Sequence, residues 1–231
     1  MKTWTIALAF LVFAISAEAN DSFVMASGGT VTPLKSNPSI RMVMEEIYVK
    51  LPEAIVEAKF VFKNEGPETK IQMGFPEESY NVPEMKKGQK TRFRWFKSTV
   101  NGKPIAVSRR ALAPKSAEDY GEHYWWVKDV SFKKGETKVI VNRYQTVPGG
   151  TYVDKSYHEV TYIVSTGAPW KGPIGNAKIT FDLGSVAKDF SAKLSSPGDE
   201  RIGKLLVWKR QNFEPTVNDN ITVYWIKKSP K

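Results

Sequence analysis

A run of cations and aromatic rings between residues 91 and 97 is the stretch of this chain best suited to bind an anion. It contains Arg92, Arg94 and Lys97, separated by phenylalanine and tryptophan. Because side chains alternate between the two faces of a β-strand, Arg92 and Arg94 are expected to share a face. A guanidinium group pairs with phosphate or carboxylate through two parallel hydrogen bonds. The run is therefore a candidate anion-binding stripe, and the alternative is a strand with one buried and one solvated face.

Three tryptophans are candidate ligand anchors. Trp125 and Trp126 are adjacent in a predicted strand, and Trp170 lies in a loop with several glycines and prolines. Since neighbouring strand residues point to opposite faces, Trp125 and Trp126 cannot both enter one core. A ring that stays exposed would be a stacking platform for a sugar or an anchor for a protein partner. The alternative is burial under a loop or against the second half of the chain.

The sequence contains no recognisable spacing of catalytic or metal-binding residues. The two histidines, His123 and His158, have neither a metal-ligand nor a catalytic spacing. Acidic residues at 118, 119 and 122 offer ligands for a calcium ion, but no glycine-spaced ligand loop accompanies them. There is no Gly-x-Ser-x-Gly motif and no phosphate-binding glycine loop before a helix. We therefore expect a noncatalytic protein without a cofactor or a metal.

The first nineteen residues have the three parts of a secretory signal peptide. Lys2 supplies the positive segment, residues 6–15 the apolar segment, and Ala17-Glu18-Ala19 the cleavage site. The apolar segment is too short to span a bilayer, and no later run reaches the roughly 18 to 20 apolar residues needed. We expect an exported mature chain that begins at Asn20 and has no transmembrane segment.

The chain is basic, with 34 Lys and Arg residues against 24 Asp and Glu residues and a formal charge of +10. This excess survives cleavage because Lys2 and Glu18 leave together. For an exported protein the expected partners are an anionic envelope polymer, a lipid headgroup or another envelope protein, and not nucleic acid. The alternative is that the lysines serve solubility alone. The absence of cysteine excludes disulfides and favours a bacterial periplasm or cell surface as the location.

Alternation of apolar and polar residues, broken at short intervals by turn residues, predicts an all-β protein. Strands are expected at 40–51, 56–62, 71–75, 93–100, 105–107, 124–132, 139–144, 157–165, 177–183, 205–209 and 221–226. Helical periodicity is nearly absent, so at most short helical turns are expected. One is expected at 117–120, and residues 186–190 fit a short helix about as well as an edge strand. The predicted architecture is two packed antiparallel sandwich-like halves.

Three local features refine this pattern. Asn101-Gly102 suits the positive φ angles of a type I′ turn. Residues 64–67 are interpreted as the turn of a hairpin, and Pro76 should end its second strand because proline cannot donate to the ladder. Residues 40–44 and 47–51 alternate with opposite parity, which predicts a bulge or bend at Glu45-Glu46 through which one strand feeds two sheets.

A boundary between the halves is expected at Pro148-Gly149-Gly150, where turn-forming glycines follow a completed hairpin. The chain would then divide into a signal peptide at 1–19, an N-terminal β-sandwich at 20–147 and a C-terminal sandwich-like half at 148–231.

Short segments of the N-terminal half carry two resemblances. Gly28-Gly29, Glu-Glu-Ile-Tyr-Val at 45–49 and Gly74-Phe75-Pro76 resemble the opening of exported bacterial proteins classed as a domain of unknown function. Lys-Ser-Ala-Glu-Asp-Tyr at 115–120 and Gly135-Glu136 are more loosely similar to the VIT (vault protein inter-alpha-trypsin) domain. That likeness implies a β-rich, noncatalytic module and gives no residue a role.

Together these observations predict a noncatalytic envelope or surface interaction module with a basic face. A carbohydrate-binding module that uses exposed tryptophans is the alternative, and an envelope hydrolase of unrecognised type is a third hypothesis. The sequence leaves the ligand open.

Overall fold

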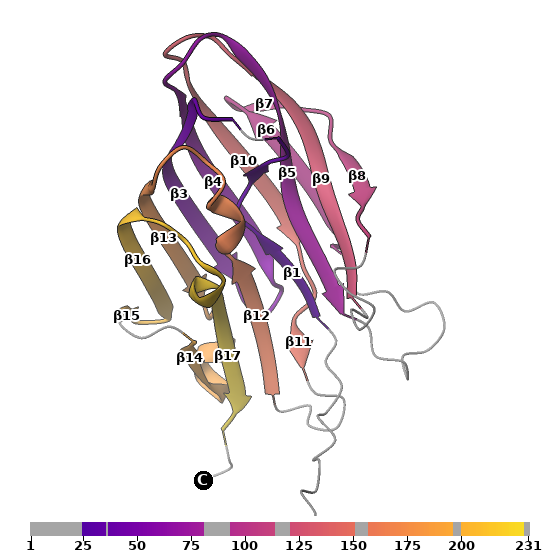
Figure 1. Ribbon diagram of the computed structural model, residues 1–231. Helices are drawn as coiled ribbons and strands as arrows, with labels where there is room; N and C mark the ends of the chain where they lie inside the picture. The colour runs from indigo at the N-terminus through magenta and orange to yellow at the C-terminus, as the bar shows by residue number, and fades with distance from the viewer. Residues whose placement is uncertain are drawn as a thin grey trace, which may run out of the picture.

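The computed structural model describes residues 25–35, 37–80, 93–113, 121–150, 157–195 and 200–228. Within them the chain is an all-β sandwich, as predicted, and Figure 1 shows its two sheets as layers lying face to face. The predicted signal peptide, Arg92 and the helical turn at 117–120 lie outside the described residues. None of the helices in the described part is long and apolar enough to cross a membrane.

The nine-stranded sheet consists of β1 (Met25–Gly29), β2 (Thr32–Pro33), β5 (Thr69–Tyr80), β8 (Ser108–Ala111), β9 (Gly121–Phe132), β11 (Gly149–Gly150), β12 (Tyr157–Ile163), β14 (Phe190–Leu194) and β17 (Ile221–Lys227). Its order is β14-β17-β12-β1-β5-β9-β8, with β11 beside β12 and β2 beside β5.

The eight-stranded sheet consists of β3 (Ile40–Lys50), β4 (Ile55–Asn64), β6 (Trp95–Val100), β7 (Lys103–Pro104), β10 (Thr137–Gln145), β13 (Ile174–Asp182), β15 (Glu200–Ile202) and β16 (Leu205–Phe213). Its order is β15-β16-β13-β3-β4-β10-β6-β7. The helical elements are α1 (Val186–Asp189) and two 3₁₀ turns, η1 (Ser165–Gly167) and η2 (Val217–Asp219).

Both halves of the chain contribute to both layers. The pairings that join the halves, β1 with β12 and β3 with β13, are parallel. Every pairing within a half is antiparallel. The halves are therefore fused edge to edge into one continuous sandwich, with one parallel seam in each sheet.

The core lies between the layers and follows the predicted alternation. In β4 the side chains of Val56, Ala58, Phe60 and Phe62 are buried, whereas Glu57 and Lys59 point outward. Burying each such valine or phenylalanine contributes about 1.5 to 3 kcal/mol. Aromatic rings also meet across the layers, as Phe75 of β5 does with Tyr144 of β10, at 5.1 Å between ring centroids.

The prediction of a hairpin across residues 64–67 is wrong. β4 pairs with β3 and β10 in one sheet, whereas β5 pairs with β1, β2 and β9 in the other. The connection is an arch between the layers, closed by hydrogen bonds from Asn64 Nδ2 to Pro67 O (2.7 Å) and from Gly66 N to Asn64 Oδ1 (3.0 Å). Two strands that face one core from opposite layers show the same alternation as two neighbours, so the pattern did not separate these cases.

Pro76 does not end β5, contrary to the prediction. On one side β5 pairs with β2 at Met73 and Gly74 and with β1 from Glu77 onward. Pro76 lies at the break between β1 and β2, where no strand partner is present on that side. The missing N–H of proline is tolerated in that position.

β3 contains a bulge, as its change in alternation predicts. The bulge precedes the predicted position at Glu45-Glu46, and the whole strand stays in one sheet instead of feeding two. The register with β4 shifts between Met42 and Met44. Gly175 of the neighbouring β13 accommodates the bulge, because a Cβ there would lie 2.5 Å from the carbonyl oxygen of Val43. As a result Glu45 points into the core, on the same side as Ile47.

The turn at Asn101-Gly102 has positive φ at both residues, 49° and 76°, as a type I′ turn requires. The strand that follows is shorter than predicted, because β7 ends at Pro104. Residues 105–107 were expected to be a strand and instead carry the chain from β7 in one sheet to β8 in the other.

Candidate functional site

Strand register arranges charges in rows on the face of the eight-stranded sheet that points away from the core, here called the outer charged face. One row runs across β6, β10, β4 and β3 through Lys97, Arg143, Glu57 and Tyr48. The next row runs across β4, β3, β13 and β16 through Lys59, Glu46, Lys178 and Lys209. Neighbouring strands lie about 4.8 Å apart, so each row is an extended line of closely spaced polar groups.

Carboxylates on this face pair with some of the cations. Arg143 Nε lies 2.6 Å from Glu57 Oε2, and Lys209 Nζ lies 2.7 Å from Glu200 Oε2. Glu46 is shared, with Lys59 Nζ at 3.5 Å and Lys178 Nζ at 3.9 Å. These groups are exposed, so each pair contributes at most about 1 kcal/mol.

Three pairs of cations among the described residues lie directly opposite each other on this face. Lys178 of β13 faces Lys209 of β16, Lys97 of β6 faces Arg143 of β10, and Arg41 of β3 faces Lys63 of β4. Like charges in directly opposite positions destabilise a sheet. Among the described residues no carboxylate pairs with Lys97. An anion bound over these positions would relieve the repulsion.

The outer charged face is hollowed over β3, β13 and β16. The depression has a volume of about 440 Å³ and is lined by three lysines, by the carboxylates Glu46 and Glu57, and by apolar groups. Tyr48 and Ile202, which line it, are 41% and 52% exposed. The Tyr48 hydroxyl donates to Asp182 Oδ2 at 2.5 Å, and this hydrogen bond raises the pKa of Tyr48 to about 12. The depression can therefore contact both charged and apolar parts of a ligand.

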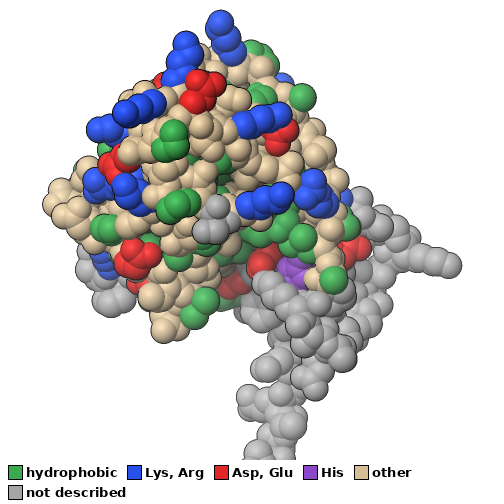
Figure 2. Space-filling model, turned by 45° about the horizontal axis from the view of Figure 1, so that its top comes forward, with side chains coloured by type: hydrophobic (Ala, Val, Ile, Leu, Met, Phe, Trp, Pro, Cys, Tyr) green, Lys and Arg blue, Asp and Glu red, His purple; other side chains and the backbone are tan. Residues whose placement is uncertain are grey.

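The predicted anion-binding stripe is only partly assembled. Lys97 is exposed on the outer charged face, beside Arg143. Arg94 is exposed just before β6 begins, and its backbone N–H donates to Gln145 O at 2.8 Å. Arg92 lies outside the described residues. On the face of the molecule seen in Figure 2, Lys and Arg side chains are spread out with Asp and Glu among them, so no single basic patch dominates that view.

The adjacent tryptophans take opposite directions, as strand alternation requires. Trp126 faces the core, where its ring stacks on Phe96 at 4.7 Å between centroids. Trp125 lies on the outer side of the nine-stranded sheet and is half-buried. It packs over Gly74, where an added Cβ would lie 2.8 Å from the indole ring. Trp125 is thus the member of the pair that a surface ligand could reach.

Trp170 is a core residue. It is 4% exposed, and its ring centroid lies 4.5 Å from that of Phe62. Its indole nitrogen donates to the carbonyl oxygen of Val31 at 2.6 Å. Because its ring is covered, Trp170 does not present a stacking platform to solvent.

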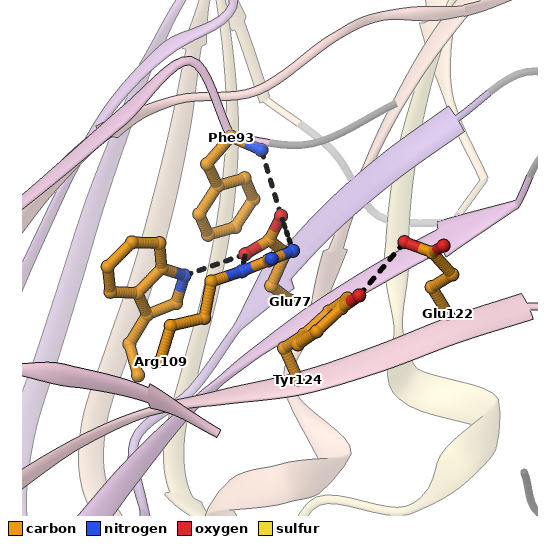
Figure 3. Close-up of polar contacts among 6 residues, drawn as sticks. Glu77, Phe93, Arg109, Glu122 and Tyr124 are labelled. Atoms are coloured by element: carbon orange, nitrogen blue, oxygen red, sulfur yellow. Dashed lines mark hydrogen bonds and ion pairs between the residues drawn. The ribbon is translucent and has the colours of Figure 1, made fainter. Parts of the chain in front are cut away.

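A fully buried carboxylate, Glu77, organises the sheet end where β5, β8 and β9 meet (Figure 3). Arg109 Nε and Trp126 Nε1 each donate to Glu77 Oε2 at 2.8 Å. Arg109 Nη2 and the backbone N–H of Phe93 each donate to Oε1 at 3.0 Å. The Arg109 guanidinium carbon also lies 3.3 Å from the centre of the Tyr124 ring. Both carboxylate oxygens accept two hydrogen bonds, so Glu77 ties its own strand to the three segments that contain Phe93, Arg109 and Trp126. Its role is structural.

Glu45 is a second buried carboxylate and lies at the seams between the halves. Its Oε1 accepts hydrogen bonds from Thr30, which follows β1, and from Tyr162 of β12. No partner for Oε2 is found among the described residues. Burial raises the pKa of Glu45 to about 7, against the opposing effect of the two hydrogen bonds. Glu45 therefore links β3 in one sheet to both halves in the other.

Lys128 is a buried cation in the N-terminal half. Its Nζ donates to Asn142 Oδ1 at 2.7 Å, an oxygen that also accepts from Ser98 Oγ at 2.8 Å. In the described part of the chain no carboxylate pairs with it. Burial lowers the pKa of Lys128 to about 7. The lysine is therefore held in the core by neutral partners alone.

The remaining candidate ligands of the sequence are dispersed. His123 is buried, with Nδ1 3.7 Å from Glu78 Oε1, whereas His158 stacks on Trp225 at 5.4 Å in the other half. In the ranges that the structure covers, no group of three or more His, Asp or Glu side chains is placed to hold a metal ion.

A family model described as "Domain of unknown function (DUF4424)" matches residues 19–125 and 135–222. The chain belongs to this family. The match confirms the resemblance to a domain of unknown function and extends it across both halves. No curated protein matches the sequence.

Among solved structures, a "putative nutrient binding protein" of Legionella pneumophila is similar to this DUF4424 chain. The TM-score is 0.71 at 22% identity, over 90% of this chain and 73% of that one. The match supports the fold. Leukotriene A4 hydrolase of Saccharomyces cerevisiae has a TM-score of 0.38 at 6% identity, over 84% of this chain and 30% of that one, and this likeness carries no argument.

Three polar residues central to this DUF4424 structure were not singled out as site residues from the sequence. Glu77 follows Ile71, Met73 and Phe75 at two-residue spacing, and Lys128 precedes Val130 and Phe132 in the same way. Glu45 shares its parity with Ile47 and Val49. In each case a charged residue occupies a strand position that the alternation assigns to the buried face, and this is the signal that could have identified all three.

Proposed function

We propose that this DUF4424 protein is an exported, noncatalytic interaction module of the bacterial envelope, and that it binds an anionic polymer through the outer charged face. The observation that carries the proposal is the placement of Lys178 opposite Lys209. Glu46 is shared between Lys178 and Lys59, and Lys209 pairs with Glu200 on its other side, so three lysines meet two carboxylates here. A phosphate or carboxylate group bound between the two lysines would offset the repulsion between their charges. The signal peptide predicted at 1–19 supports export.

The shape of the face supports an extended ligand. Rows of charges cross several strands. The depression of about 440 Å³ is lined by Tyr48 and Ile202, by three lysines and by two carboxylates that pair with neighbouring cations. A polymer with repeated anionic groups and an apolar backbone would contact both. The similarity in fold to a protein described as nutrient binding is compatible with a binding role and gives no ligand.

The test is binding to dextran sulfate, used as a linear polyanion, at 20 and 300 mM salt. The double variant Lys178→Gln/Lys209→Gln should weaken binding about tenfold at low salt, and salt should weaken wild-type binding strongly. The matched control is Lys133→Gln/Lys134→Gln, which removes two exposed lysines from the β9–β10 connection. Equal effects of the two double variants, or binding that salt does not change, would contradict the proposal.

A second candidate function, carbohydrate binding, is favoured by Trp125, whose ring lies across Gly74 on the outer side of the nine-stranded sheet. Stacking of a sugar on this ring should be insensitive to salt. A neutral glycan array with Trp125→Ala tests it, and Lys178→Gln/Lys209→Gln is the control. Glycan binding that Trp125→Ala leaves unchanged would exclude this candidate.

A further inference from the structure

A cavity of about 320 Å³ opens at the end of the sandwich where β12 begins and β17 ends, at the bottom of Figure 1. Three aromatic residues of the nine-stranded sheet line it, His158 of β12, Trp225 of β17 and Phe190 of β14. His158 lies directly opposite Trp225, which belongs to the core, so both face inward. Phe190 shares this inner face, because Ala192, two residues further along β14, is also opposite Trp225. All three rings therefore lie on the side of the sheet that faces the other layer.

The three rings are packed against one another. His158 stacks on the buried Trp225, with 5.4 Å between ring centroids and 26° between planes. The Phe190 centroid lies 6.0 Å from that of His158, and the planes meet at 60°. His158 and Phe190 are half-buried, so they form two adjoining walls that a ligand can reach. The volume is at the lower end of the range for small-molecule sites.

The remaining lining is apolar or acidic, unlike that of the outer charged face. Pro52 of the β3–β4 turn and Pro148 before β11 add rigid apolar surface. No lysine or arginine lines the cavity, and its acidic residue is Asp189, exposed at the end of α1. The nearby Lys228 Nζ donates to two carbonyl oxygens of α1, at 2.8 and 3.3 Å, and Lys227 is exposed outside the cavity. Among the described residues no cation forms an ion pair with Asp189.

We propose that this cavity binds a small apolar organic cation of the quaternary ammonium class. The negative faces of aromatic rings attract a cation that lies within about 6 Å of a ring centre. The methyl groups of the ligand would pack against Phe190, His158 and the two prolines, and Asp189 would offset the positive charge. A primary ammonium ion suits the site less well, because it is strongly hydrated. The inference goes beyond the proposed function, since no residue that lines the depression of the outer charged face lines this cavity.

Calorimetric titration of the purified protein with choline tests the inference. Neohexanol has the shape of choline with a carbon atom in place of the charged nitrogen, and ethanolamine has a charge without the methyl groups. Choline should bind about tenfold more tightly than either, because only choline combines the charge with the apolar surface.

Two variants assign the binding to this cavity. Phe190→Leu keeps an apolar side chain but removes the ring, and it should weaken choline binding about fivefold while changing neohexanol binding less than about twofold. Phe213→Leu is the matched control, since Phe213 is a half-buried ring that packs on Trp208 outside the cavity. Asp189→Asn should weaken choline binding severalfold and leave neohexanol binding unchanged. Its control is Glu214→Gln, which removes an exposed carboxylate that does not line the cavity.

The inference is overturned if choline binds no more tightly than neohexanol, or if ethanolamine matches choline, because simple ion pairing would then explain the binding. Equal effects of Phe190→Leu and Phe213→Leu would also overturn it. If Phe190→Leu unfolds at a lower temperature, the comparison of the three ligands on wild type and Asp189→Asn decides the matter. None of these outcomes affects the dextran sulfate test, which depends on Lys178 and Lys209.

Discussion

Replacing Glu45 with glutamine should remove a pH dependence of stability that the wild-type protein shows between pH 4.5 and 7. The folded state holds a proton on Glu45 up to a pKa of about 7, whereas the unfolded chain releases it near the ordinary pKa of 4.5. The folded state therefore binds more protons in this window. Its free energy of unfolding falls as the pH rises from 4.5 to 7 and is level with respect to this group above pH 7.

The size of this fall follows from the shift in pKa. A difference of about 2.5 units, at about 1.36 kcal/mol per unit, corresponds to about 3 kcal/mol. Glutamine keeps an oxygen that can accept from Thr30 and Tyr162. Its amide N–H groups occupy the place of Oε2, which has no partner among the described residues, and leaving them unpaired costs about 1 to 3 kcal/mol. The variant should therefore be less stable by up to this amount at every pH, and it should lack the wild-type slope between pH 4.5 and 7.

The assay is urea unfolding at pH 5, 6, 7 and 8, followed by tryptophan fluorescence. Glu57→Gln is the control, because Glu57 is an exposed carboxylate on the outer charged face and the variant should keep the wild-type slope. All other titratable groups are the same in wild type and Glu45→Gln, so their contributions to the slope cancel in the comparison. Equal slopes for wild type and Glu45→Gln between pH 5 and 7 would refute the reasoning.

Three further predictions concern the other buried features. The pKa of Lys128 is about 7 in the folded protein and 10.5 in the unfolded chain, so wild-type stability should rise by about 5 kcal/mol between pH 7 and 10.5. Lys128→Met should abolish that rise, measured by urea unfolding at pH 7.5 to 9.5. Glu77→Gln should cost about 3 to 5 kcal/mol because it leaves Arg109 without its buried partner, and an unchanged melting temperature would contradict this. Gly28→Ala places a Cβ 2.4 Å from the hydroxyl of Tyr144 and should destabilise the protein by about 1 to 3 kcal/mol. In thermal unfolding, the double variant Gly28→Ala/Tyr144→Leu should recover part of this loss, because leucine is smaller than tyrosine.

The alternation of residue types predicted the fold class because it reports which face of each strand is buried. In β4 and β13 the residues predicted to point inward are all buried. Alternation carries no information on which strand lies beside which, and for this reason the arch between β4 and β5 was interpreted as a hairpin. The parallel seams were missed for the same reason, since β1 with β12 and β3 with β13 pair across more than a hundred residues.

The sequence predicted an excess of positive charge but not the arrangement of these charges on the outer charged face. Lys178 and Lys209 are far apart in sequence, and only the register of β13 with β16 brings them together. Lys97 was identified from its own strand, but Arg143, its neighbour on β10, was not. The directions of Trp125 and Trp126 followed from alternation, whereas the burial of Trp170 depends on contacts with Phe62 and Val31 that no local pattern contains.

The two parallel seams also determine how this polypeptide can be divided. A fragment that stops at residue 147 would present β1 and β3 as open edges, and the remaining fragment would present β12 and β13. Open strand edges recruit other strands. Separately produced fragments should therefore reassemble with each other when mixed and self-associate when alone, a property on which a split-protein reporter could be built.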